Sequence, residues 1–383
     1  MITSALAVLP LVWVLPLVAQ EGADWPQFRG GPEQRGLSPV ALPPAMSLAW
    51  AFKTEGAILG SPVISAGVVY TGSRDGKCYA VGLRDGAKRW EAALKAEIEA
   101  SPTVVSLPTG KLVVIGDTDG LLVALDPATG AERWHFKAGD KICGAAAPFR
   151  SQGETRLVFG SYDNSMHCLD AASGAERWSY TTGSYINGTP AIATIAGVQV
   201  AIVGGCDAHL HVVDLKDGMR VRAIELSAYV ASSVAVDGGL AWVGDYGNEV
   251  ACIDLAGGAV KWRYDQGKSP FFSSAAVGDA LVIIGSRDRQ VLALDRMTGA
   301  ERWSFTTQGN VDGSPVIGGT RVLIGSDDGH LYLLDLATGA KAWSYEIGGK
   351  VGGSPAVCGS MAITGCEDGS LYAFTMKEIG NGK

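Results

Sequence analysis

The chain has 383 residues, of which 47% are hydrophobic and 18% are charged, so it is long and apolar enough to bury a large core. Its net charge is −8, and like charges nowhere form a block. A nucleic-acid-binding protein usually carries a basic face or stripe, so the composition argues against a nucleic-acid partner.

The first twenty residues have the character of a targeting segment. No charged side chain occurs from Met1 to Gln20, and residues 5–19 are apolar. These fifteen residues suit a signal peptide and are fewer than the ~20 that a membrane-spanning helix needs. We therefore expect residues 1–19 to be a signal peptide cleaved after Ala19, which predicts a periplasmic or extracellular protein with no stable membrane insertion. An uncleaved membrane anchor is the alternative.

Residues 20–46 are predicted to form an N-terminal arm and linker. Pro39, Pro43 and Pro44 fall near its end. Prolines favour an extended backbone, so this part of the chain is expected to be an extended connector.

From residue 47 onward the sequence repeats at intervals of 40, 44, 44, 84, 41 and 40 residues, measured between tryptophans. The interval of 84 holds one further unit, in which Arg222 takes the Trp position. Repeats of this length indicate supersecondary units that bury their apolar faces against their neighbours. The large flat indoles are expected to dock neighbouring units against each other. The tryptophans are Trp50, Trp90, Trp134, Trp178, Trp262, Trp303 and Trp343.

Each unit contains four short stretches rich in Val, Ile, Leu and aromatic residues, separated by turn residues, which predicts four β-strands. A glycine four residues before the Trp position can supply the positive φ of a tight hairpin. An aspartate four residues before that glycine can accept hydrogen bonds from the turn backbone. Asp126, Gly130 and Trp134 show this spacing in one unit.

The string Asp-x-x-[Thr/Ser]-Gly-x-x-x-Trp, as in residues 126–134, 170–178 and 295–303, resembles the signature of the pyrroloquinoline-quinone (PQQ) repeat. The resemblance covers residues 48–376 and implies an all-β, eight-bladed β-propeller of four-stranded antiparallel blades. We place the propeller at residues 47–376, followed by a C-terminal tail at 377–383. The arm from Asp24 to Gly31 is similar to the N-terminal segment of PQQ-repeat proteins and quinoprotein alcohol dehydrogenases.

The way the ring closes follows from counting strands. The last unit ends without a Trp strand of its own, whereas the strand from Leu48 to Lys53 has no blade before it. We expect this N-terminal strand to complete the eighth blade. Closure of the ring removes sheet edges that would otherwise be open to aggregation.

Polar residues recur in the repeats without forming a recognisable catalytic or metal-binding motif. Seven units carry an aspartate between the second and third strands, which suits a hairpin turn; a cation-attracting or partner-binding rim is the alternative. His167 and His211 share one position of the repeat and His209 and His330 another, but equivalent positions on neighbouring blades diverge in space, so we expect no metal site. The seven cysteines are an odd, scattered set for which we predict no structural disulfide. The aspartates are Asp75, Asp119, Asp163, Asp207, Asp288, Asp328 and Asp368, with Gly247 in the remaining unit.

The resemblance offers two functions. PQQ-dependent dehydrogenases of the family carry adjacent cysteines over the quinone, a calcium held by Glu, Asn and Asp, and an aspartate base. This chain has no adjacent cysteines and no long insertions between its units. We therefore predict no catalytic residue, no metal ligand and no cofactor, with a PQQ- and calcium-dependent alcohol dehydrogenase as the alternative.

The non-catalytic, BamB-type branch of the family agrees with the length, the blade number and the predicted export. It implies a monomeric protein-binding or scaffolding module whose partners are cell-envelope proteins. No cysteine precedes Cys78, so the lipid attachment site of that branch is missing.

The loops that lead into the first strand of each unit are expected to ring one end of the central channel. Phe271 and Phe272 form the most exposed-looking apolar pair of these loops. Packing within the ring is one interpretation of such residues, and a ligand or peptide funnel is the other. The predicted partner-binding funnel consists of Tyr185, Asn187, Phe271, Phe272 and Asp312.

Overall fold

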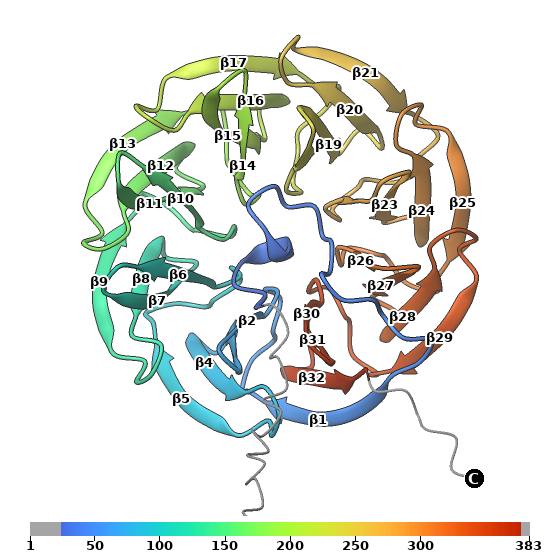
Figure 1. Ribbon diagram of the computed structural model, residues 1–383, viewed down its shortest axis with the longest axis horizontal. Helices are drawn as coiled ribbons and strands as arrows, with labels where there is room; N and C mark the ends of the chain where they lie inside the picture. Colours follow the sequence, from blue (N-terminus) through green and yellow to red (C-terminus); the bar gives the residue numbers. More distant parts are fainter. Residues whose placement is uncertain (1–23, 377–383) are drawn as a thin grey trace, which may run out of the picture.

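The computed structural model describes residues 24–376, so the predicted signal peptide and C-terminal tail lie outside the described residues. Eight four-stranded antiparallel sheets stand as blades around a central axis (Figure 1). This arrangement confirms the all-β, eight-bladed propeller.

The strands of the first four blades follow one another in sequence and in space. Blade 1 contains β2 (Val63–Ser65), β3 (Val68–Gly72), β4 (Lys77–Gly82) and β5 (Lys88–Ala93). Blade 2 contains β6 (Thr103–Leu107), β7 (Gly110–Gly116), β8 (Leu121–Leu125) and β9 (Glu132–Lys137). Blade 3 contains β10 (Ala147–Ser151), β11 (Glu154–Gly160), β12 (Ser165–Asp170) and β13 (Glu176–Thr181). Blade 4 contains β14 (Ala191–Ile195), β15 (Val198–Gly204), β16 (His209–Asp214) and β17 (Arg220–Glu225).

The remaining blades keep the same order until the last one. Blade 5 contains β18 (Ala235–Asp237), β19 (Leu240–Gly244), β20 (Val250–Asp254) and β21 (Ala259–Tyr264). Blade 6 contains β22 (Ala276–Val277), β23 (Leu281–Ser286), β24 (Gln290–Asp295) and β25 (Glu301–Thr306). Blade 7 contains β26 (Val316–Gly318), β27 (Arg321–Gly325), β28 (His330–Asp335) and β29 (Lys341–Glu346). Blade 8 contains β30 (Ala356–Cys358), β31 (Met361–Gly365), β32 (Ser370–Thr375) and the N-terminal β1 (Ser47–Lys53).

Blade 8 closes the ring as expected. β1 pairs antiparallel with β32, from Ser47 opposite Thr375 to Lys53 opposite Ser370. The first strand of the chain and its last strand are therefore neighbours in one sheet (Figure 1).

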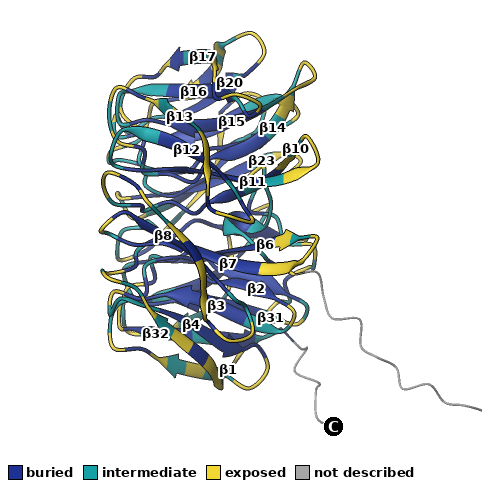
Figure 2. Cartoon of the chain, turned by 90° about the vertical axis from the view of Figure 1, so that its left-hand side faces the viewer, coloured by how far each residue is buried: buried dark blue, intermediate teal, exposed yellow. Residues whose placement is uncertain are grey.

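The core lies between the blades. All five residues of β8 are buried, whereas the outer strand β9 alternates between exposed and covered positions. Exposed residues gather in the loops and turns at the two faces of the disc and along parts of the outer strands (Figure 2). Polar side chains on outer strands protect the sheet edges from pairing with other chains.

Each outer strand carries the side chain that docks the next blade. The indole of Trp90 in blade 1 donates from Nε1 to the carbonyl of Pro127 in blade 2, at 2.9 Å. Its ring lies on Gly130, which has φ +73°, and a Cβ at Gly130 would come within 2.7 Å of the ring. The other junctions of an indole with a glycine pair Trp50 with Gly86, Trp134 with Gly174, Trp178 with Gly218, Trp262 with Gly299, and Trp303 with Gly339.

Two junctions depart from this pattern. At the junction of blades 4 and 5, Arg222 lies against Gly258 and donates to the carbonyl of Ala256 at 2.8 Å. In blade 7, Trp343 packs edge-on against Phe374 of blade 8, with ring centroids 5.7 Å apart.

The blade topology gives the disc two distinct faces. Because the four strands are antiparallel, the loop before the first strand and the turn between the second and third strands share one face, which we call the funnel face. The other two turns share the opposite face, which we call the arm face.

The N-terminal arm fills the centre of the ring, where its short helical turn η1 (Phe28–Gly30) lies (Figure 1). Trp25 pairs with Ile64 of blade 1 through two backbone hydrogen bonds of 2.9 and 2.8 Å. Backbone carbonyls of the arm then accept hydrogen bonds from first strands in blades 2, 4, 5, 6 and 7, through Pro26, Pro32, Glu33, Arg35 and Gly36.

Arg29 anchors η1. It is 2% exposed, and its guanidinium donates to the carbonyls of Ala275 and Pro315 in blades 6 and 7. Residues 37–42 run along blade 7, where Leu42 donates to the carbonyl of Gly318. The arm is thus more than the extended connector predicted from its prolines, because residues 24–36 form part of the packed channel.

Within the described residues, no helix has the length and apolar character needed to cross a membrane.

Candidate functional site

The eight loops before the first strands share one buried apolar position. Its members pack against the glycine that ends or nearly ends the second strand, and all are buried. Phe271 holds this position in blade 6, where it is 0% exposed and covers Gly244. The interpretation of Phe271 as an exposed anchor does not agree with the structure, because the side chain belongs to the core. The full set is Ile58, Ile98, Ile142, Ile186, Val230, Phe271, Val311 and Val351.

The next residue of every loop faces the channel axis and lines a pocket there. This position varies in chemistry from blade to blade. Three predicted funnel residues, Asn187, Phe272 and Asp312, come together in this pocket, whereas Tyr185 is not among its lining residues. The eight residues are Leu59, Glu99, Cys143, Asn187, Ala231, Phe272, Asp312 and Gly352.

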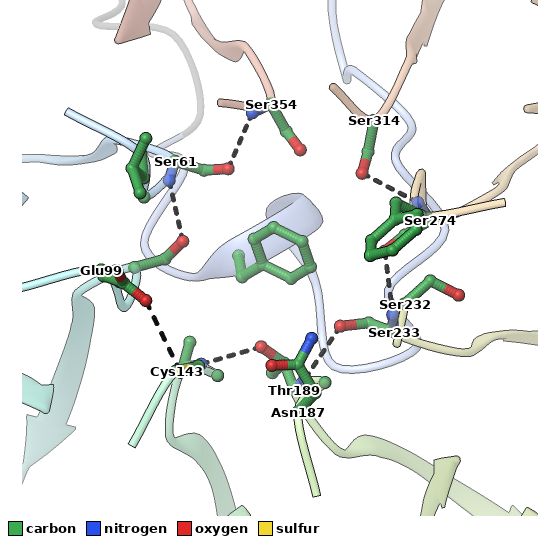
Figure 3. A pocket seen from close by; sticks show the side chains of 18 of the residues that line it. Ser61, Glu99, Cys143, Asn187, Thr189, Ser232, Ser233, Ser274, Ser314 and Ser354 are labelled. Carbon is green, nitrogen blue, oxygen red and sulfur yellow. Dashed lines mark hydrogen bonds between the residues drawn. The ribbon is translucent and has the colours of Figure 1, made fainter. Parts of the chain in front are cut away.

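A ring of hydroxyl groups lies two residues further along each loop (Figure 3). The hydroxyl oxygen of one blade accepts a hydrogen bond from the backbone N–H of the blade before it. The Ser61 N–H donates to Ser101, for example, at 2.8 Å. In blade 3 the position is Ala145, which interrupts the ring. The hydroxyls that accept such bonds, at 2.8 to 3.0 Å, belong to Ser61, Ser101, Thr189, Ser233, Ser274 and Ser314.

Phe28 of η1 also lines the pocket and comes from the arm rather than from a blade. Figure 3 shows η1 crossing the centre of the ring of hydroxyls. The pocket has a volume of about 170 Å³. Ligand sites for drug-sized molecules usually measure ~300–1,000 Å³, so this one is small.

Two carboxylates stand in the pocket wall, and each is held by an arginine outside the lining. Glu99 accepts from Arg74 at 2.5 Å, and Asp312 accepts from Arg287 at 2.7 Å. These hydrogen bonds raise the pKa of both guanidinium groups. No lysine or arginine lines the pocket within the described residues.

Cys143 lies next to Glu99 and close to Ala145, the position at which the ring of hydroxyls is interrupted. Its Sγ lies 3.9 Å from Glu99 Oε2, and burial raises the pKa of the thiol to about 11. A thiol with so high a pKa stays protonated near neutral pH and is a poor nucleophile. The structure shows all seven cysteines as free thiols.

The funnel face carries five aromatic residues over blades 3 to 6, which we call the aromatic arc; one of them, Phe272, also lines the pocket. Tyr162 and Tyr185 stack at 4.8 Å, Tyr229 and Tyr246 lie 4.4 Å apart, and Tyr246 meets Phe272 edge-on at 4.8 Å. Tyr185 and Tyr229 are 47% and 46% exposed. The sequence analysis did not identify Tyr162 and Tyr246. Both directly precede the position of the turn aspartate in their repeats, and this shared position could have placed them on the funnel face.

Cations cover two members of the arc. The guanidinium of Arg287 lies 3.5 Å from the ring centroid of Phe272, and Lys141 Nζ lies 4.1 Å from that of Tyr162. Both are cation–π contacts, which hold the rings in place.

The turn aspartates share the funnel face but point into its loops. Asp75 accepts from the backbone N–H groups of Glu55 and Lys77 and from the Tyr79 hydroxyl, at 2.7 to 3.0 Å. Similar bonds occupy other members of the set, among them Asp163, which meets His167 at 2.9 Å. Among residues 24–376, no three His, Cys, Asp or Glu side chains are grouped so that they could hold a metal ion.

Comparison with solved structures finds similar propellers. BamB from Moraxella catarrhalis matches with a TM-score of 0.70 and 21% identity, over 88% of this chain and 100% of that one. The computationally designed Ika8 protein matches with a TM-score of 0.72 and 18% identity, over 86% and 99%. Quinohemoprotein alcohol dehydrogenase from Comamonas testosteroni matches with a TM-score of 0.75 and 15% identity, over 92% and 80%. At these identities the likeness shows the fold alone.

Comparison with curated protein sequences gives no significant match. A family model described as outer membrane protein assembly factor BamB matches in four segments, at residues 41–106, 105–229, 207–309 and 290–381. The matches together cover nearly all of the propeller and confirm the predicted PQQ-repeat resemblance. With its eight blades, its repeat and this match along its length, the chain belongs to the BamB family of PQQ-repeat propellers.

Proposed function

We propose that this protein is an exported, monomeric, non-catalytic propeller that binds other proteins of the cell envelope through its funnel face. Membership of a family described as an outer membrane assembly factor supports an envelope location. The apolar N-terminal segment supports export to the periplasm or beyond it.

The aromatic arc is the observation that carries this proposal. Tyr185 and Tyr229 are about half exposed although each already lies against a second tyrosine. Their rings are therefore ordered before any partner arrives, so binding costs little side-chain entropy. Tyrosine and arginine are enriched among the residues that dominate protein interfaces, and Arg287 stands within the same surface.

The pocket lining argues against the dehydrogenase alternative. PQQ carries three carboxylates, and no lysine or arginine lines the pocket within the described residues. Arg29 lies nearby in η1, but it is buried and donates to two backbone carbonyls. Glu99 and Asp312, the carboxylates that would have to hold a calcium ion, are each ion-paired with an arginine. The residues of the pocket thus do not fit PQQ with calcium.

The test is capture of envelope proteins by purified protein carrying Tyr185→Ser and Tyr229→Ser together. Both side chains are exposed, so the melting temperature should change little while capture is lost. The matched control is Met219→Ser with Met297→Ser, two residues 69% and 65% exposed in turns of the arm face.

The control should capture the same proteins as the native chain. If the tyrosine variant also captures them, the arc is not the interface. Reduction of a dye with alcohols after PQQ and calcium are added would establish the dehydrogenase instead.

A further inference from the structure

We infer that the axial pocket binds one ring of a neutral saccharide, most simply the terminal residue of a glycan chain. The inference concerns the pocket lined by Phe28 and the hydroxyl ring. The pocket shares Phe272 with the aromatic arc, but Tyr185 and Tyr229, on which protein docking is tested, are not among the residues that line it, so the two ideas can be tested separately.

The first argument is a set of unused hydrogen-bond donors. The six hydroxyls that accept a neighbouring N–H have no acceptor for their own protons within the described residues. All six residues are at most 7% exposed and line the pocket. Each hydroxyl therefore keeps a proton that it can donate to a ligand in the pocket. A ligand that brings several oxygen atoms to the ring would satisfy these donors together.

The second argument is charge. Within the described residues, no lysine or arginine lines the pocket to bind an anion directly. Glu99 and Asp312 are each ion-paired with an arginine that already balances their charge, so a cation is not required either. A largely polar lining does not suit an apolar ligand. A neutral molecule that both donates and accepts hydrogen bonds matches these side chains.

The third argument is the pair of phenyl rings. Phe28 comes from the arm and Phe272 from a blade, and both line the pocket. Because Arg287 already covers one face of Phe272, Phe28 is the ring against which a sugar would lie. The face of an aromatic ring is electron-rich and attracts polarised C–H groups. A sugar ring presents C–H groups on its faces and hydroxyls along its edge. It can therefore lie against a phenyl ring while its edge meets the surrounding hydroxyls.

The fourth argument is size and access. At about 170 Å³ the pocket is smaller than the sites that hold drug-sized ligands, ~300–1,000 Å³. It suits a single ring rather than a fused cofactor. The arm occupies the centre of the ring of blades, so a ligand reaches the pocket from the funnel face, and the rest of a glycan would leave past the aromatic arc.

The experiment is saturation-transfer-difference NMR on the full protein. The probes are methyl α-D-glucopyranoside, methyl α-D-mannopyranoside, methyl N-acetyl-β-D-glucosaminide, maltose and cellobiose. We expect at least one of them to bind saturably, with a Kd in the millimolar range or tighter, and to receive magnetisation on its ring protons. PQQ with calcium should not compete.

Two variants test the site. Phe28→Leu keeps an apolar side chain without the aromatic face. Ser354→Ala removes the ring hydroxyl of blade 8, which lines the pocket and accepts no neighbouring N–H within the described residues, so the hydrogen bonds between the blades are kept. Each should weaken binding about tenfold, on the order expected for the loss of one aromatic or hydrogen-bonded contact. Melting temperatures near that of the native chain show that the arm and ring remain in place.

The arc variant with Tyr185→Ser and Tyr229→Ser should still bind the monosaccharide probes, which separates this inference from protein docking. The inference is overturned if no probe binds saturably at ~10 mM, a concentration that would detect millimolar affinity. It is also overturned if both pocket variants bind like the native chain, or if PQQ displaces the sugar.

Discussion

The guanidinium of Arg222 lies against Gly258 in the position that an indole occupies over a glycine at six other junctions between blades. Arg222 keeps the hydrogen bond to the next blade, because it donates to the carbonyl of Ala256 as the indoles donate to their own acceptors. Its buried Nε has no hydrogen-bond partner. An arginine thus reproduces the bond of a tryptophan with less apolar contact.

We predict that Arg222→Trp stabilises the protein by about 1 kcal/mol, because it restores the aromatic contact with Gly258. Urea denaturation followed by tyrosine and tryptophan fluorescence would measure the change. At another junction, Trp303→Ala removes the docking indole and should lower the free energy of unfolding by about 3–5 kcal/mol, as truncations of large core aromatics do. If Arg222→Trp leaves the free energy of unfolding unchanged, the arginine already packs against Gly258 as well as an indole would.

Phe271 and Phe272 are adjacent, but truncation of Phe271 should destabilise the protein far more than truncation of Phe272. Phe271 is fully buried against Gly244, so Phe271→Ala should destabilise the protein by about 3–5 kcal/mol. Phe272 is partly exposed in the pocket wall, so Phe272→Ala should lower the melting temperature only slightly. Thermal unfolding of the two variants side by side is the measurement, and equal losses would contradict the assignment of Phe271 alone to the core.

Asp117 is a buried carboxylate whose Oδ2 has no hydrogen-bond partner. At the same position in blade 1, the Ser73 hydroxyl donates to the carbonyl of Gly56 at 3.1 Å. Asp117→Asn would supply a donor while the other oxygen keeps its two backbone bonds. We expect a gain of about 1 kcal/mol in the free energy of unfolding.

Asp245 provides the control for this change. It occupies the same position in blade 5, but its Oδ2 accepts from the Ser227 hydroxyl at 2.6 Å. Asp245→Asn should therefore give no gain in stability. A similar gain in both variants would mean that removing negative charge, rather than pairing the buried oxygen, is responsible.

The thiol of Cys143 should become reactive only at high pH. Burial raises its pKa to about 11, above the ~8.5 of a free cysteine, so the thiolate fraction stays low near neutral pH and rises as pH approaches 11. Alkylation of folded protein by iodoacetamide, followed by mass spectrometry of the Cys143 peptide, should accelerate between about pH 8 and pH 10. Unfolded, unreduced protein should yield seven alkylated cysteines, and a stable disulfide would contradict this.

The blades could be predicted from sequence because their junctions depend on side chains with a fixed spacing. Trp90 and Gly130 mark one such junction, and Arg222 could be placed by counting alone. The channel could not be predicted in the same way. Pro26 and Glu33 join the arm to the blades through backbone carbonyls, and a backbone bond leaves no pattern in the sequence.

The candidate site was predicted in part for a related reason. Asn187, Phe272 and Asp312 share one loop position, which the repeat locates on the axis. Phe271 could also have been placed correctly, since every loop has a buried apolar residue there, but hydrophobicity alone does not distinguish a core residue from an exposed anchor. Phe28 lies in the pocket only because the arm enters the ring, so no feature of the repeat points to it.

The route of the arm also sets the order in which the molecule can be completed. Arg29 binds the carbonyl of Pro315, 286 residues further along the chain, and β1 needs β32 as its partner. Contacts between such distant residues form slowly, because closing a long loop costs entropy before any contact is gained. Although the arm and β1 precede the blades in the chain, Arg29 can reach its final place only after blade 7 has been synthesised, and β1 only after blade 8.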